Sequence, residues 1–236
     1  MTRTTELKRV LISVSAIVLP LILLVFGFYG SFSFTFTIPV VWQLGILGKG
    51  AGSLGLDRKR LAICLITGLL TGLILALSGG CILKIFGMTG YTMENVRELN
   101  GLLSLPGNDF SIKGEAGFRL LTSNAPVTVF ASLLYCLFLV GLGEEIFWRG
   151  FIQKKMMRLV PAGLSIWITA ALFGMVHIYL FLLIPPVDAA VFILLITLAG
   201  AVWGSMFEYL DNVWAPAVSH GVAAFIIWRY FVFQVV

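Results

Sequence analysis

The stretch APVTVFASLLYCLFLVGLGEEIFWRG, residues 125–150, decides the kind of fold that this chain adopts. Most of it is apolar, and about 20 such residues suffice to cross a bilayer as a helix. Near its end stand two adjacent carboxylates, Glu144 and Glu145, and a guanidinium, Arg149. Ionisable groups are costly inside a bilayer, so they usually face the interior of a helix bundle and mark a functional site. The stretch therefore predicts a membrane helix that carries part of a site.

The composition of the whole chain supports a membrane protein. Of its 236 residues, 59% are hydrophobic and only 11% are charged, and the mean hydropathy is +1.02. Soluble domains usually carry about 25% charged residues. The net charge of +5 does not indicate nucleic-acid binding, because the basic residues cluster between apolar segments as topology signals do. We expect an all-α, polytopic bundle of transmembrane helices with the lipid bilayer around it.

Seven apolar segments are candidates for membrane spans, at residues 10–28, 31–48, 61–86, 125–150, 163–184, 188–208 and 213–235. The second of them is rich in Ser and Thr, and six spans result if it is re-entrant or interfacial. Seven spans place the N-terminus and the basic clusters near Arg9, Arg58–Arg60 and Lys154–Arg158 in the cytoplasm, as the positive-inside rule requires.

Two regions in the first half of the chain need interpretation. The first apolar segment is longer than the hydrophobic region of a signal peptide, about 7–15 residues, so it is interpreted as a retained anchor, and the chain suits a bacterial plasma membrane. Residues 88–124 form a long polar connection, with a short amphipathic helix expected around 93–104. The chain thus divides into residues 1–124, which hold N-terminal spans and this loop, and a helix core at 125–236.

Two pairs of glycines at helical spacing, Gly68/Gly72 and Gly200/Gly204, have room for a second helix to approach closely. Such pairs are common in membrane helices. They indicate where helices can touch and say nothing about function.

The candidate catalytic groups lie in three different spans. Glu145 and Arg149 are four residues apart and can pair on one helix face, whereas Glu144 lies about 100° around the helix. Glu144 is therefore expected to face His177 and His220, the two histidines of the chain, each in another apolar segment. In that arrangement Glu144 acts as general base on a water molecule, and the imidazoles polarise the water or stabilise an oxyanion.

The same groups have other uses. Glu144, His177 and His220 could ligate zinc, although the chain lacks the H-E-x-x-H spacing that places two ligands on one helix. Buried charges also serve proton relay or ion transport, but transporters of that kind repeat a broken helix in two halves, and the sequence shows no such duplication.

Three motifs in order carry a resemblance to a known family. Glu-Glu-x-x-x-Arg at 144–149, Phe-x-x-x-His ending at His177, and WAPAVSH ending at His220 resemble the CPBP family. That family comprises CAAX prenyl endopeptidases of the Ras-converting type, bacteriocin-processing proteins and related Abi proteins. The resemblance covers roughly residues 125–225.

The resemblance implies an intramembrane endopeptidase acting on a peptide or protein substrate at the membrane: a CAAX-like protein, a leader peptide or a pro-peptide. It assigns water activation to Glu144, support to Glu145 and Arg149, and the remaining catalytic roles to His177 and His220. Family members are often described as metalloproteases; we expect the metal-free glutamate mechanism, with no cofactor, and keep zinc as the alternative.

One position departs from the family pattern. The third motif usually has Asn or Asp four residues after its histidine, where this chain has Ala224. The amide there is thought to bind the oxyanion, and loss of one such donor costs about 10²–10³ in rate. Either another donor such as Asn212 substitutes, or activity is weak. A catalytically impaired relative that acts as a membrane scaffold or immunity protein is the alternative function.

Overall fold

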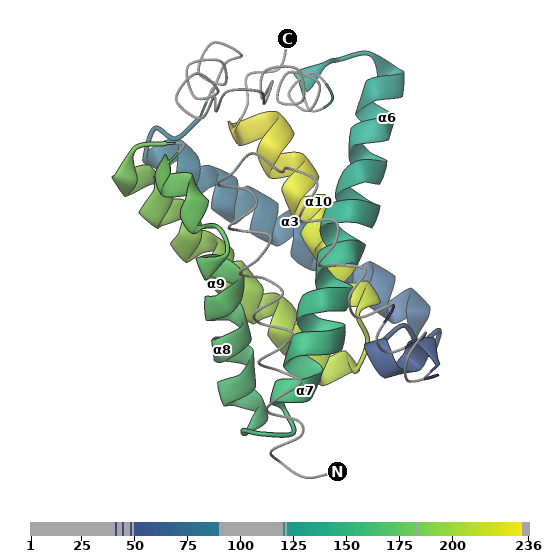
Figure 1. Ribbon diagram of the computed structural model, residues 1–236. Coiled ribbons are helices and arrows are strands. Elements are labelled where there is room, and N and C mark those ends of the chain that lie inside the picture. The colour runs from purple at the N-terminus through teal and green to yellow at the C-terminus, as the bar shows by residue number, and fades with distance from the viewer. Residues whose placement is uncertain are drawn as a thin grey trace, which may run out of the picture.

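The described part of the chain is entirely helical. The computed structural model describes residues 41, 44, 48, 50–89, 120, 122–182 and 184–232. Its elements are, in chain order, η2 (Ala51–Leu54), α3 (Leu61–Ile85), α6 (Pro126–Leu134), η3 (Tyr135–Gly143), η4 (Ile146–Gln153), α7 (Lys154–Met156), α8 (Ala162–Met175), η5 (Ile178–Leu182), α9 (Pro186–Leu210), α10 (Trp214–Ile227) and η6 (Trp228–Val232). In Figure 1, α10 lies between the helix that ends in α7 and the hairpin of α8 and α9.

Four helices in this part of the chain are long and apolar enough to cross a membrane: Leu61–Ile85, Pro126–Met156, Pro186–Leu210 and Trp214–Val232. A helix of 25 residues is about 37 Å long, which exceeds the hydrocarbon thickness of about 30 Å. Many outward side chains are apolar as well, which suits contact with lipid and not with water. The protein is an integral membrane protein.

The predicted count of seven spans is not confirmed. The predicted span at 10–28, almost all of the one at 31–48 and the short helix at 93–104 lie outside the described residues. The spans predicted at 61–86 and 188–208 match α3 and α9 to within two residues at each end.

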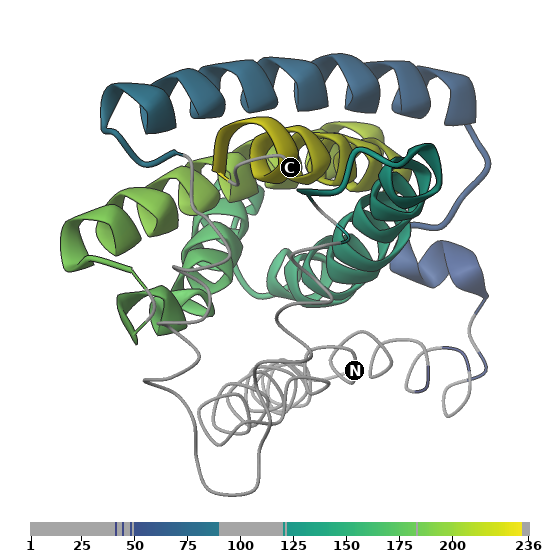
Figure 2. The ribbon, with the colours of Figure 1, turned by 90° about the horizontal axis from the view of Figure 1, so that it is seen from above.

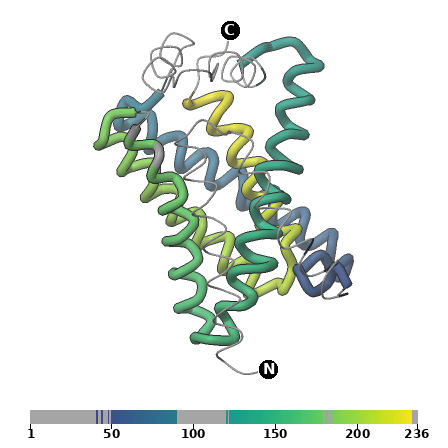
Figure 3. Tube along the Cα trace, viewed as in Figure 1, coloured from purple at the N-terminus to yellow at the C-terminus, as the bar shows by residue number. Residues whose placement is uncertain are grey.

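The longest helix runs without a break from Pro126 to Met156 and carries both glutamates (Figure 3). Its η3 and η4 segments are π-helical, so their backbone hydrogen bonds reach one residue further than in an α-helix. Such segments are rare and are frequently found at functional sites. The helix was predicted to end at residue 150; it continues for six more residues, and Lys154 and Lys155 lie in its last turn, where positive charge is favourable.

Paired glycines allow α10 to cross the long helix closely. A Cβ atom on Gly141 would collide with the backbone of α10, and one on Gly221 would lie 2.7 Å from the Cα atom of Leu137. Real Cβ atoms do not approach other atoms so closely, so only glycine fits on both sides of this crossing. The crossing fixes where residue 220 meets the helix that bears the glutamates.

The two predicted glycine pairs are also contact sites. Figure 2 shows α3 running alongside α10, and Cβ atoms on Gly68 and Gly72 would lie 2.6 Å and 2.8 Å from carbonyl oxygens of α10. On α9, Gly200 and Gly204 face buried side chains of the long helix. Glycines therefore let α3 pack closely against α10, and let α9 pack closely against the long helix.

The span predicted at 163–184 is not one continuous helix. The helix α8 ends at Met175, and a turn at Val176 and His177 leads into the short 3-10 helix η5. His177 itself explains the end, because its side-chain Nδ1 lies 2.9 Å from the carbonyl oxygen of Phe173, four residues back. A histidine that hydrogen-bonds one of the last carbonyls of a helix is a common way to end it.

Candidate active site

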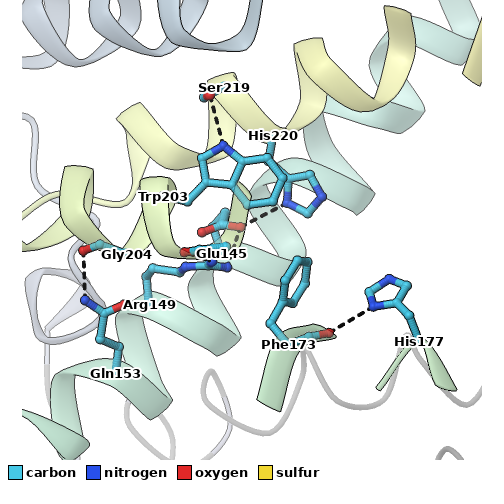
Figure 4. A network of polar contacts seen from close by, with 10 residues as sticks. Glu145, Arg149, Gln153, Phe173, His177, Trp203, Gly204, Ser219 and His220 are labelled. Carbon is cyan, nitrogen blue, oxygen red and sulfur yellow. Dashed lines mark hydrogen bonds and ion pairs between the residues drawn. The ribbon is translucent and has the colours of Figure 1, made fainter. Parts of the chain in front are cut away.

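Four elements bring the candidate catalytic residues together in the bundle (Figure 4). The long helix contributes Glu145 and Arg149, the end of α8 contributes Phe173 and His177, and α10 contributes His220. The helix α9 closes the group with Trp203 and two glycine carbonyls.

The predicted pairing of Glu145 with Arg149 is confirmed. The guanidinium Nη1 donates to the carboxylate Oε1 across 2.8 Å, and both side chains are fully buried. The guanidinium Nη2 also donates to the Gly200 carbonyl oxygen at 2.8 Å, and its carbon atom Cζ lies 5.0 Å from the centre of the Phe173 ring. The cation is thus held by a carboxylate, a carbonyl and an aromatic face, which is the combination a buried arginine needs.

The histidine of α10 hydrogen-bonds the supporting carboxylate. His220 Nδ1 lies 2.9 Å from Oε1 of Glu145, the same oxygen that accepts from Arg149. Sequence reasoning had assigned Glu145 to the arginine and had left both imidazoles to Glu144. One carboxylate binds both Arg149 and His220, because the glycine crossing carries α10 over this turn of the long helix.

Glu144 lies beside this network and is only partly buried. It interacts electrostatically with His220, Glu145 and Arg149, so it is within reach of the site that sequence reasoning assigned to it. Its role as the base that activates water stays a prediction.

The two imidazoles approach the same aromatic ring. The ring centre of Phe173 lies 5.2 Å from that of His177 and 5.7 Å from that of His220, and both contacts are edge-to-face. Figure 4 shows this ring between the two histidines. Phe173, the first residue of the Phe-x-x-x-His motif, therefore packs directly against both candidate catalytic side chains.

Hydrogen bonding assigns the same tautomer to both neutral imidazoles. The carbonyl oxygen of Phe173 and the ionised carboxylate of Glu145 can only accept hydrogen bonds, so Nδ1 of His177 and of His220 must donate. Nε2 of each neutral ring is then unprotonated and can take up a proton. Either ring can donate from Nε2 only after it has become an imidazolium.

Sequence reasoning missed two buried side chains at this site. Trp203 stacks on His220 with ring centres 4.0 Å apart, and its indole nitrogen donates to Oγ of Ser219 at 3.0 Å. Gln153, fully buried, donates to the Gly204 carbonyl oxygen at 2.9 Å. Gln153 continues the four-residue series of Glu145 and Arg149, and that spacing was a readable signal.

The substitute oxyanion donor suggested from sequence lies elsewhere. The side-chain nitrogen of Asn212 donates to the backbone oxygen of Asp57 at 2.9 Å, and its oxygen accepts from the backbone nitrogen of Trp214. These bonds join the connection between α9 and α10 to the segment before α3. Ala224 is buried in α10 and has no polar side-chain atom to offer.

A grouped set of metal ligands is absent from the residues that the structure describes. No three side chains of His, Cys, Asp and Glu lie together there as metal ligands, and this includes the suggested zinc set of Glu144, His177 and His220. The metal-free mechanism stays a prediction.

The comparisons with known proteins bear on this region. Residues 126–226 match the family model described as type II CAAX prenyl endopeptidase Rce1-like. No curated protein and no solved structure matches the chain with significance. The matched residues begin with the long helix and end within α10, so they contain every candidate catalytic residue. This similarity over 126–226 supports the resemblance to the CPBP family, and in this region the protein is similar to Rce1-like membrane proteases of the CAAX type.

Proposed function

We propose that the protein is an intramembrane endopeptidase that hydrolyses a peptide bond of a membrane-associated substrate: a CAAX-like protein, a leader peptide or a pro-peptide. The observation that carries the proposal is the buried chain of contacts from Arg149 through Glu145 to His220, with Glu144 beside it. Such an arrangement fixes one imidazole and leaves one carboxylate able to meet water.

The proposed reaction begins at Glu144. Its carboxylate takes a proton from a water molecule while the water oxygen bonds to the carbon of the scissile carbonyl. The carbonyl oxygen becomes an oxyanion, and the proton passes from Glu144 to the amide nitrogen as the C–N bond breaks. The products are a new carboxylate and a new amine.

The two histidines have different proposed roles, which follow from their different hydrogen-bond partners. His177 is held by a neutral carbonyl, which suits a neutral ring whose Nε2 positions the water. His220 is held by a carboxylate, and as an imidazolium it can donate from Nε2–H to the oxyanion. Since Ala224 supplies no amide, this imidazolium is the proposed main oxyanion donor.

Cleavage of a defined probe tests the proposal. In proteoliposomes, the wild type should cleave a fluorogenic peptide that ends in a prenylated CAAX sequence, and the same peptide without the prenyl group tests whether the lipid is required. Glu144→Gln should lower kcat by about 10²–10⁴, the usual contribution of general acid–base catalysis. The matched control Glu208→Gln changes an exposed glutamate of α9 and should cleave like wild type. A Glu144→Gln protein as active as the control would overturn the proposal.

A chelator applied to the same vesicles tests the metal-free mechanism. Cleavage should continue unchanged in o-phenanthroline or EDTA, because the proposed proton transfers use protein groups alone. Loss of cleavage that added zinc restores would contradict this part of the proposal and favour the alternative zinc set.

The second candidate function is a catalytically impaired relative that acts as a membrane scaffold or immunity protein. Ala224 is the observation that favours it. In that case neither the wild type nor Glu144→Gln would cleave any probe, while both would give the same cellular phenotype.

A further inference from the structure

The strongest unassigned contact in the site is the one between Trp203 and His220. Their rings are 4.0 Å apart and inclined by only 21°, so the indole lies flat against the imidazole. Trp203 is 4% exposed and His220 is 7% exposed. The edge of Phe173 contacts the imidazole as well, 5.7 Å from its centre and nearly perpendicular.

The indole is itself held in place. Its Nε1–H donates to Oγ of Ser219, the residue that precedes His220 in α10, at 3.0 Å. Its ring also lies 5.6 Å from Cζ of Arg149, which pairs with the carboxylate that binds His220. The indole thus contacts the histidine, the histidine's neighbour in sequence and the cation that supports the histidine's partner.

These contacts restrict how the imidazole can turn. The bond to Glu145 orients Nδ1, but by itself it does not prevent a rotation of the ring about its Cβ–Cγ bond, which would take Nδ1 away from the carboxylate and move Nε2. A flat aromatic surface on one face of the imidazole blocks that rotation. A misplacement of about 1 Å in a catalytic group can cost about 10²-fold in rate.

We propose that Trp203 is a positioning residue that holds the His220 imidazole with Nδ1 on Glu145 and Nε2 toward the reacting carbonyl oxygen. The direction of Nε2 rests on the function proposed above, whereas the orientation of Nδ1 does not. The bond from Trp203 to Ser219 keeps the indole flat against the imidazole.

NMR of the imidazole nitrogens measures the tautomer of each histidine directly. The chain contains two histidines, so protein labelled with ¹⁵N-histidine gives two imidazole spin systems, which His177→Gln assigns by removing one. At a fixed alkaline pH, the ring nitrogen shifts show which nitrogen carries the proton. In the wild type, Nδ1 of His220 should be protonated.

Trp203→Leu removes the flat surface. We expect His220 to populate both tautomers, and kcat for the prenylated probe peptide to fall by about 10²-fold with KM little changed. The matched control Trp167→Leu makes the same chemical change on the exposed face of α8, where Trp167 is 56% exposed, and should leave both readouts unchanged.

Two milder variants keep the test decisive if Trp203→Leu does not fold. Trp203→Phe keeps an aromatic face but loses the hydrogen bond, and Ser219→Ala loses the same bond from the other side. Each frees the indole to tilt away from the imidazole, so His220 should show a minor population of the second tautomer. The value of kcat should fall by no more than about tenfold, which is what one neutral hydrogen bond contributes. Because they remove one shared bond, the double variant should be no worse than either single variant.

The outcomes separate the two proposals. A His220 tautomer unchanged in Trp203→Leu, or in both milder variants where that protein does not fold, would overturn the positioning role whatever the activity. An altered tautomer with unchanged kcat would overturn it too. If the wild type cleaves nothing, the proposed peptidase function fails, while the nitrogen shifts still decide whether Trp203 orients the imidazole.

Discussion

At the scale of single residues, Glu145 joins the two halves of the site. One of its oxygens accepts from Arg149 at 2.8 Å and from His220 at 2.9 Å, and no water reaches the carboxylate, which is fully buried. A buried ion pair has a large desolvation cost that only good geometry and further hydrogen bonds offset. Removal of one partner should therefore lower the stability of the protein strongly, whereas removal of both charges should lower it little.

Substitution of the arginine alone tests this balance. Arg149→Met leaves the Glu145 carboxylate buried without its cation and should lower the free energy of unfolding in detergent by about 3–5 kcal/mol. The double variant Glu145→Gln/Arg149→Met should recover most of that loss, because no charge stays buried. Lys59→Met, at a side chain that is 89% exposed, serves as control and should stay within about 0.5 kcal/mol of wild type. A single variant as stable as the double one would contradict the argument.

At the scale of elements, the crossing of α10 over the long helix sets the distance between His220 and Glu145. Gly141 and Gly221 let the two backbones touch, and the π-helical turns of η3 lie at the same crossing. The end of α8 adds the second imidazole, because His177 ends its own helix by bonding the Phe173 carbonyl. Helix geometry, not loop conformation, therefore positions the candidate catalytic groups.

A methyl group at the crossing should disturb both stability and activity. Gly141→Ala places a Cβ atom against the backbone of α10, and we expect a loss of about 1–3 kcal/mol in unfolding free energy, as for an overpacked core. Cleavage of the probe peptide should fall as well, since α10 carries His220 away from Glu145. Gly163→Ala is the matched control, because nothing lies within 4 Å of a Cβ atom there. If the two variants were equally stable, the helices at the crossing could move apart to fit the methyl group, and the prediction would be wrong.

At the scale of the whole molecule, hydrogen bonds define the two ends of the bundle. Lys154 pairs with Asp211 at 3.3 Å, and Asn212 bonds the backbone of Asp57, so the basic segments before α3 and at the end of α7 lie at one end. At the opposite end of α10, the Arg229 side chain donates to Asn124 at 2.8 Å. From the positive-inside rule we predict that the first end faces the cytoplasm.

Labelling of single cysteines tests this orientation. In a protein whose three native cysteines are replaced, Lys59→Cys should react with a membrane-impermeant maleimide only in inside-out vesicles. Ala125→Cys, at an exposed position before α6, should react only in intact cells. Labelling of both positions from the same side would contradict the assignment.

Composition and spacing were enough to predict the class and the candidate residues. High hydropathy and few charges leave a bilayer as the natural solvent, and the main-chain groups must then bond within helices. The four-residue spacing of Glu145 and Arg149 predicted their pairing, since residues so spaced share a helix face. Three motifs in order predicted a resemblance to the family whose model matches residues 126–226.

Tertiary structure alone decided which groups meet. Sequence spacing constrains neighbours within one helix, but it does not say which face of α10 turns toward which carboxylate, so the bond from His220 to Glu145 was not predictable. The same holds for Trp203, whose role depends on the angle at which α9 passes the imidazole. Contacts between residues far apart in the chain depend on how closely whole helices can pack. Here that distance is set by glycines that lie against the backbone of α10 and by flat aromatic rings.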